Sequence, residues 1–205
     1  MTTVAPGFLP EPRVRRFSQL TVGLVLYGAS LALLVTADFG LDPWDVFHQG
    51  LAETIDLRLG FAVVLTSFVV LLLWIPIRQR PGLGTLMNAV MIGLVFEATI
   101  ELLPDEASLP SRVFLLLAAV GLNAIATGMY VGAGLGPGPR DGLMTGIADR
   151  GYQIKVVRTS IEVVVLAVGW LLGGSVGIGT IVYALGIGPL VHRTLPYFTI
   201  RNSVA

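Results

Sequence analysis

Five side chains have types and spacings suited to binding an ion or a charged solute: Asp45, His48, Arg140, Asp141 and Glu162. Asp45 and Asp141 occupy the same position in two copies of one short stretch, so two carboxylates related by a repeat could bind a cation or a proton. Each Asp also lies in the first turn of an expected helix, where an acid contributes about 0.3–1 kcal/mol by interacting with the helix dipole. Both interpretations stay open at this stage.

Arg140 stands where the first copy of the stretch has Trp44. It could anchor to lipid phosphate, pair with Asp141 or Glu162, or bind an anionic group of a substrate through its planar guanidinium. Glu162 is the only acid in an otherwise apolar segment, and an acid inside a membrane is by default a candidate functional residue. Arg158 precedes it by four residues, so an ion pair along one helix face is the competing interpretation.

His48 follows Asp45 by three residues, which places both on one face of a helix. A proton relay or pH sensor would use such a pair, although a histidine on the polar face of the helix is the simpler interpretation. The chain has no Cys and only two His, so a metal centre is not predicted. P-loop, dinucleotide-binding and nucleophile-elbow motifs are absent, so neither an enzyme nor a cofactor is predicted.

The positions of these residues follow from an internal repeat. Residues 40–45 (GLDPWD) recur at 136–141 (GPGPRD), 96 positions later, and residues 82–93 recur at 177–188, 95 positions later. Asp42 can serve as a helix N-cap, and Pro43 and Pro139 suit the first helical position. The two Gly-x-Gly-Thr stretches are expected to be tight turns or close-contact segments, because small residues allow close approach. The motif positions predicted to be structural are Gly40, Pro43, Gly82, Gly84, Thr85, Gly136, Pro139, Gly177, Gly179 and Thr180.

The composition predicts an integral membrane protein. The chain is 54% apolar and 13% charged, against about 25% charged residues in soluble domains, and its mean hydropathy is +0.82. The formal net charge is zero, so a basic surface for nucleic acid is not predicted, and the lipid bilayer is the expected partner. The predicted fold is an all-α polytopic helix bundle with two repeats, each of three spans and one short helix.

The predicted boundaries follow the apolar runs. The spans are residues 17–37, 60–77, 86–103, 112–133, 156–173 and 181–197, and the short helices are 43–55 and 139–150. The divisions are a disordered tail at 1–16, the first repeat at 17–103, a linker at 104–111, the second repeat at 112–197 and a tail at 198–205.

Three spans per repeat would invert the second repeat relative to the first, as in many transporters. All basic residues except Arg58 and Arg112 then fall on the cytosolic side, which predicts a multi-pass protein of the cell (inner) membrane with both termini in the cytoplasm. If the short helices also crossed the membrane, the repeats would be parallel. Their polarity argues against this alternative, because polar groups facing lipid are costly.

The two repeated motifs resemble the YczE/YyaS/YitT group of bacterial integral membrane proteins, and most closely its YczE-like branch. The residues that carry the resemblance are 40–45, the Gly-x-Gly-Thr-x-x-Asn-Ala of residues 82–89, and their second copies. The resemblance covers roughly residues 17–195 and implies a helical membrane fold. It implies no settled activity, although transport has been considered for members of the group.

Two functions are therefore carried forward. The first is a putative transporter of an unidentified small solute or ion, with its site between the repeats. The alternative is a non-transporting accessory or regulatory protein, acting as a homo-oligomer or with a partner membrane protein. A polar cavity between the repeats would favour transport, whereas a solid core with a glycine-lined outer groove would favour the accessory role.

Overall fold

The computed structural model describes residues 12–104 and 106–200, and all the regular secondary structure in these ranges is helical. The helices are α1 (Arg13–Ala37), α2 (Pro43–Thr54), α3 (Leu59–Leu72), α4 (Trp74–Ile77), α5 (Leu83–Ile100), α6 (Leu109–Gly132), α7 (Pro139–Ala148), α8 (Ile154–Leu171) and α9 (Ile178–Phe198). The predicted all-α helix bundle is thus confirmed. Below, residues 12–104 are called the first half and residues 106–200 the second half.

Five of these helical segments are long and apolar enough to cross a membrane: α1, α3 with α4, α5, α6 and α9. The predicted sixth span exists as helix α8, but its 18 residues include Lys155, Arg158 and Glu162. These charges make α8 more polar than the five helical segments that are apolar enough to cross a membrane. Whether α8 crosses the bilayer remains a prediction.

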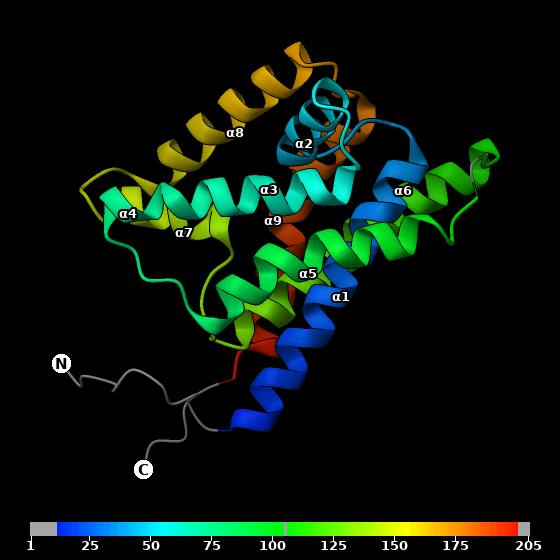
Figure 1. Ribbon diagram of the computed structural model, residues 1–205. Coiled ribbons are helices and arrows are strands. Elements are labelled where there is room, and N and C mark those ends of the chain that lie inside the picture. The colour runs from blue at the N-terminus through cyan, green and yellow to red at the C-terminus, as the bar shows by residue number, and fades with distance from the viewer. Residues whose placement is uncertain (1–11, 105, 201–205) are drawn as a thin grey trace.

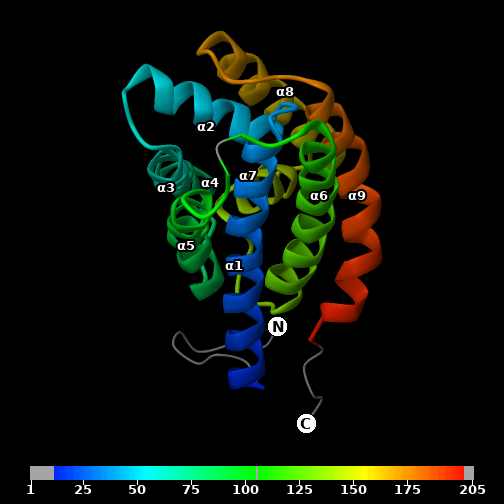
Figure 2. The ribbon, with the colours of Figure 1, turned by 90° about the vertical axis from the view of Figure 1, so that its right-hand side faces the viewer.

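The centre of the bundle is built around α1. This helix packs against α5 on one side and α6 on the other, α9 packs against α6, and α3 packs against α5. Figure 2 shows α1 and α6 side by side and running in opposite directions, with α9 beyond α6. Leu20, Leu24 and Leu31 of α1 are fully buried against Ile92 and Phe96 of α5. The apolar face of α1 therefore forms the main core.

The short helices lie across the two halves. Helix α2 packs against α3 and α8, and α7 packs against α3, α4 and α8 (Figure 1). Helix α2 begins as predicted, because the Asp42 side chain accepts hydrogen bonds from the backbone N–H groups of Trp44 and Asp45 and Pro43 fills the first helical position. Helix α7 also begins with a proline, Pro139, but its N-cap is Gly138 and offers no side chain.

The repeated Gly-x-Gly-Thr motifs were predicted as tight turns or close-contact segments, and the structure shows close contacts at the starts of two helices. Each motif caps the start of a long helix, α5 or α9, where the Thr hydroxyl accepts a hydrogen bond from the backbone N–H of the N-cap glycine. Each also contacts the other half: Gly84 N–H donates to Leu135 C=O at 2.8 Å, and Gly179 N–H donates to Phe39 C=O at 2.7 Å. Only residues without side chains let backbone approach backbone this closely.

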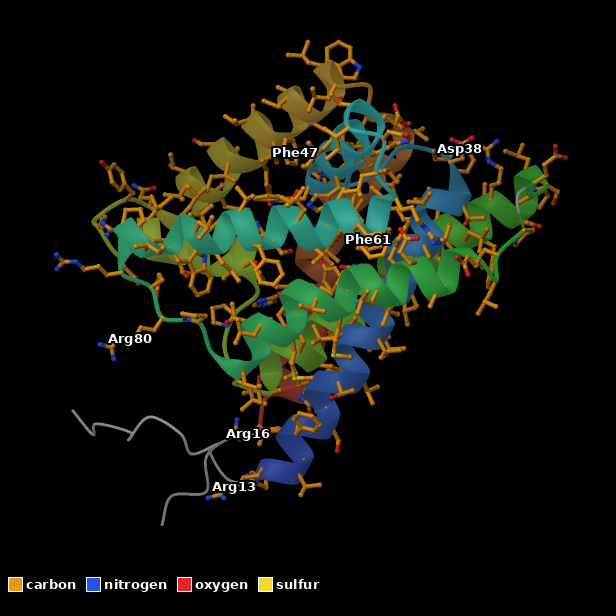
Figure 3. All side chains as sticks on the ribbon, viewed as in Figure 1. Arg13, Arg16, Asp38, Phe47, Phe61 and Arg80 are labelled. Atoms are coloured by element: carbon orange, nitrogen blue, oxygen red, sulfur yellow. The ribbon has the colours of Figure 1, made fainter. Side chains whose placement is uncertain are left out.

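Charged side chains distinguish the two ends of the bundle. At one end, called here the Arg16 end, the Arg16 guanidinium donates to Ala133 C=O at 2.7 Å and to Ile200 C=O at 3.1 Å. At the opposite end, called the Asp38 end, Arg112 binds Asp38 at 2.9 Å. Figure 3 places Arg13, Arg16 and Arg80 toward the first of these ends and Asp38 at the other.

The predicted tails need one correction. Helix α1 begins at Arg13, and Arg16 is buried, so residues 13–16 belong to the bundle and not to a disordered segment. The physical reason is that two backbone carbonyls satisfy the Arg16 guanidinium inside the protein, which no local sequence pattern reveals. The remainder of the predicted N-terminal tail, residues 1–11, and residues 201–205 lie outside the described residues.

Candidate functional site

A buried cluster of charged groups joins α2 of the first half to α7 of the second. The Arg140 guanidinium lies 3.5 Å from Asp45 Oδ1 and 3.9 Å from Asp42 Oδ1. His48 Nδ1 lies 2.9 Å from the same oxygen of Asp45. Because a carboxylate can only accept, this contact puts the proton of His48 on Nδ1. The two half-chains are thus connected by ion pairs away from solvent.

The predicted partners of Arg140 were Asp141 and Glu162, and the structure pairs it instead with Asp42 and Asp45 of the other half. Trp44 completes its surroundings, since the Arg140 guanidinium carbon lies 5.1 Å from the Trp44 ring centroid. The residues that occupy equivalent positions in the two sequence copies therefore contact each other through a cation–π interaction. Neighbouring residues along α7 could not indicate this long-range pairing.

The charges in this cluster do not cancel. Asp42 and Asp45 are each 3% exposed and His48 is 1% exposed, and the burial of His48, followed by the nearby Arg140 charge, holds its pKa well below 6.5. Two carboxylates therefore face one guanidinium. Burial and then the neighbouring Asp45 raise the pKa of Asp42 to about 7. The cluster is thus able to hold an additional proton or cation near neutral pH.

Three buried atoms of the cluster have no hydrogen-bond partner among the described residues: Asp42 Oδ2, Asp45 Oδ2 and His48 Nε2. Unsatisfied buried polar atoms are uncommon because each costs about 1–3 kcal/mol. Asp42 also lines the central cavity described below. A buried carboxylate with one unsatisfied oxygen is consequently part of the cavity wall.

Asp141 has different surroundings from Asp45. Its carboxylate accepts a hydrogen bond from the Tyr130 hydroxyl, and the Tyr130 ring packs edge-on against Tyr27 with centroids 5.9 Å apart. Asp141 lies in the first turn of α7, at the position that the sequence predicted. The Tyr130 hydroxyl thus holds the Asp141 carboxylate at the cavity wall.

These groups surround a cavity of about 650 Å³ between the two halves. Helices α1, α3 and α5 of the first half and α6, α7, α8 and α9 of the second half all contribute to its wall. Its polar lining includes Tyr27, Asn88, Asn123, Thr127 and Tyr183. Asn123 also connects two helices, because it donates to Ser30 at 2.9 Å and accepts from Tyr183 at 3.0 Å.

The five predicted site residues fall into two groups around this cavity. Arg140, Asp141 and Glu162 line it, whereas Asp45 and His48 lie behind its wall and contact Arg140. Glu162 pairs with Arg158 at 2.8 Å, as the four-residue spacing predicted. His48 was expected on the polar face of α2. That face points into the protein, where Arg140 of the second half contacts it.

Sequence reasoning missed Asp42 as a site residue and did not select Tyr27, Asn123, Tyr130 or Tyr183. Asp42 was identified only as a helix cap. Its Oδ1 has that role, and its Oδ2 has no hydrogen-bond partner among the described residues. A polar signal was present in the sequence, since Asn123 and the tyrosines interrupt apolar spans. Only the packing of α1 against α6 and of α6 against α9 shows that they share one space.

One side of the cavity is closed more tightly than the other. In the first half, α3 packs against α5, and a Cβ built on Gly93 would lie only 2.2 Å from the Gly60 carbonyl oxygen. In the second half, α8 and α9 are not packed along each other, and a Cβ on Gly188 would meet nothing within 4 Å. Both α8 and α9 line the cavity, and they diverge from their linker in Figures 1 and 2.

Comparisons with known proteins place this architecture among uncharacterized proteins. Residues 14–196 match a family of unknown function, DUF6198. An uncharacterized protein of Haemophilus influenzae is 39% identical over 192 residues, covering 93% of this chain and 88% of its own. The uncharacterized membrane protein YczE of Bacillus subtilis is 32% identical, with coverage of 92% and 89%. YyaS of the same organism is 26% identical, with coverage of 85% and 90%. No solved structure matches.

Proposed function

This chain belongs to DUF6198, a family of unknown function, and we propose that it transports a small solute across the membrane. The observation that carries the proposal is the cavity of about 650 Å³ lined by helices of both halves. Cavities of about 300–1,000 Å³ are typical of sites for small organic molecules. The membrane nature of the protein agrees with its similarity to the membrane protein YczE.

The arrangement of the halves supports an inverted repeat. Each half has a long helix, a short helix and two further helical segments in the same order. The contacts between halves are reciprocal, since Gly84 binds Leu135 while Gly179 binds Phe39. Such reciprocal pairs are expected of units related by a two-fold axis. Inverted repeats with a site at their interface allow alternating access by rocking of one half against the other.

The charged cluster gives the cavity a further feature of transport sites. Asp42 and Asp45 are buried at the junction of α2 and α7, and the Arg140 side chain that pairs with them is 19% exposed. Ionisable groups at membrane depth are costly and are retained mainly on substrate, ion or proton pathways. In this proposal, protonation of the Asp42–Asp45 pair weakens its attraction for Arg140. Protonation would thereby loosen the contact between the two halves.

The orientation follows from the distribution of basic residues. Arg13, Arg16 and Arg80 lie toward the Arg16 end (Figure 3), and Arg150 bonds Pro76 C=O at the end of α4. Both basic residues predicted on the other side, Arg58 and Arg112, are paired with acids there. The positive-inside rule therefore assigns the Arg16 end to the cytoplasm, with both termini on that side of the inner membrane.

Two-sided accessibility of the cavity tests the proposal without knowledge of the solute. The native chain has no cysteine, so Thr127→Cys places a single thiol in the cavity wall. Right-side-out and inside-out vesicles are treated with a membrane-impermeant maleimide, and the rate of labelling is measured in each. A protein that alternates between two open states is labelled from both sides.

Two cysteines at the ends of the bundle calibrate the vesicles. Ala148→Cys, at the end of α7, and Ser108→Cys, just before α6, should each react from one side only, and from opposite sides. If Thr127→Cys reacts from a single side under all conditions, transport is rejected. The accessory-protein alternative then accounts better for the fold.

A further inference from the structure

Carboxylates outnumber guanidinium groups around the cavity. Four acids (Asp42, Asp45, Asp141 and Glu162) and two bases (Arg140 and Arg158) lie in or directly behind its wall. The Arg158 guanidinium forms an ion pair with the Glu162 carboxylate at 2.8 Å. Arg140 is shared between Asp45 and Asp42. With every group ionised, the balance is four negative charges against two positive charges, which favours a positively charged ligand.

Two of these acids, Asp42 and Asp141, line the cavity. Asp42 is 3% exposed, lines the cavity and leaves its Oδ2 without a hydrogen-bond partner among the described residues. Asp141 also lines the cavity, and the contact recorded for its carboxylate is the neutral Tyr130 hydroxyl. A buried acceptor without a donor is stabilised when a ligand supplies an N–H group.

The aromatic lining suits the same kind of ligand. Tyr27, Trp44, Tyr130 and Tyr183 all contribute to the cavity wall. The protein already holds one cation on this wall, because the Arg140 guanidinium lies 5.1 Å from the Trp44 ring centroid. A second cation facing the Tyr27–Tyr130 pair would gain from the same interaction, which is stronger in sites shielded from water.

The remaining lining and the open side point to an organic body. Met144, Ile187 and Val191 give the wall apolar surface, and the cavity is far larger than a single metal ion needs. The unpacked boundary between α8 and α9 includes Gly188, which faces open space. A solute with an apolar portion can approach through this boundary, whereas a bare inorganic cation would lose its hydration there.

We propose that the cavity binds a small protonated amine with an apolar body, its ammonium group held by Asp141 and the free oxygen of Asp42. This assignment rests on the proposed transport function and names the chemical class of its substrate. An anionic solute is disfavoured because Arg140 is already paired with two carboxylates. A free anion would also meet the charges of Asp141 and Glu162.

Three probes that differ in the charge of one end group test this assignment. Purified full-length protein in detergent is titrated by calorimetry with 2-phenylethylamine (a cation at neutral pH), 2-phenylethanol (neutral) and 3-phenylpropanoate (an anion). Protein-free micelles provide the blank for partition into detergent. The amine should bind, and both the alcohol and the carboxylate should bind at least about tenfold more weakly, because they cannot neutralise the acids.

The variants locate the ammonium group. Asp141→Asn should weaken amine binding by about tenfold or more, and Asp42→Asn, which keeps a capping side chain, should weaken it in the same direction. Asp149→Asn is the matched control, since it makes the same change to an exposed acid at the other end of α7. If Asp141→Asn does not fold, Asp42→Asn carries the test against the same control.

The assignment is overturned if 3-phenylpropanoate binds as tightly as the amine, or if the site variants bind the amine as tightly as Asp149→Asn does. It is also overturned if no probe binds at concentrations up to about 10 mM, which exceeds the dissociation constant of even a weak specific site. This binding test does not depend on transport. Amine binding together with one-sided labelling of Thr127→Cys would reject transport and keep the amine site. Two-sided labelling without amine binding would keep transport and reject the amine.

Discussion

Asp42 combines two roles in one carboxylate. Its Oδ1 caps helix α2 by accepting from Trp44 N–H and Asp45 N–H at 2.9 and 3.2 Å. Its Oδ2 has no partner among the described residues. A cap at a protein surface would have water on the second oxygen, but here burial and the charge of Asp45 raise the pKa of the group to about 7. The residue that the sequence marks as a helix cap is therefore, in the fold, a carboxyl group that titrates near neutral pH.

Replacement of Asp42 by Asn should change how stability depends on pH. The usual pKa is 3.8 and the folded pKa is about 7, so between these values the folded protein keeps a proton that the unfolded chain has released. The free energy of unfolding therefore falls as pH rises through this window and is constant for this group above it. Asp42→Asn cannot titrate, so its thermal midpoint should match the native one near about pH 3, below both pKa values, and exceed it near about pH 8.

Thermal unfolding in detergent at several pH values is the measurement. Asp56→Asn serves as the control, because Asp56 lies in an exposed turn with φ of 53°, a conformation that Asn tolerates. The native pH profile should persist in this control. A profile for Asp42→Asn that is parallel to the native one would mean that Asp42 keeps its charge throughout, and that the Arg140 contact outweighs burial.

At the scale of elements, the two halves use related helices in different ways. Helices α3 and α5 meet at the glycine pair Gly60 and Gly93, and Glu97 of α5 accepts a hydrogen bond from Gly60 N–H at 2.6 Å. Helices α8 and α9 have no such contact, and Gly188, the sequence counterpart of Gly93, faces open space. One boundary of the cavity is therefore closed and the other open.

This difference predicts opposite outcomes for one substitution at two matched positions. Gly93→Ala forces a Cβ to 2.2 Å from the Gly60 carbonyl oxygen, so it should lower the free energy of unfolding by roughly 1–3 kcal/mol through overpacking. Gly188→Ala meets nothing within 4 Å and should be neutral or raise stability by up to about 1 kcal/mol, because Ala favours helix more than Gly does. Thermal unfolding of both variants decides; equal losses would show that α8 closes on α9 in solution.

At the scale of the whole molecule, the two ends differ in charge. The Arg16 end joins the start of α1, the end of α6 and the segment after α9 through the two hydrogen bonds of Arg16. The Asp38 end joins the end of α1 to the start of α6 through Arg112. The chain thus starts α1 and ends α9 at one end of the bundle, which an even number of crossings requires. With five apolar spans, α8 must supply the sixth crossing in the proposed topology.

The topology is tested by labelling of a single cysteine in cells. Ala148→Cys should react with a membrane-impermeant maleimide only after the membrane is permeabilised, because α7 ends toward the basic, cytosolic side. Ser108→Cys should react in intact cells. Labelling of Ala148→Cys from outside alone would invert the orientation. Reaction of both cysteines from outside would mean that α7 also crosses the membrane, because only α6 and α7 lie between the two positions.

Local patterns in the sequence were sufficient for the helices and their starts. Apolar runs predicted the long helices, and Asp42-Pro43 and Pro139 predicted the beginnings of α2 and α7, because hydrophobicity and capping act within a few residues. The same locality caused the error in the N-terminal tail. Arg16 is buried because the backbone carbonyls of residues 133 and 200 accept hydrogen bonds from its guanidinium.

The site itself was decided by tertiary structure. Asp45, His48 and Arg140 were identifiable as unusual charges, but nothing near Arg140 in the sequence specifies that Asp42, Asp45 and Trp44, more than 90 positions away, surround it. The cavity, the spare oxygen of Asp42 and the pairing of Asp141 with Tyr130 likewise depend on how α1, α6 and α7 pack. Electrostatic pairing and burial act through space, so only the folded chain determines which charges are compensated and which remain for a ligand.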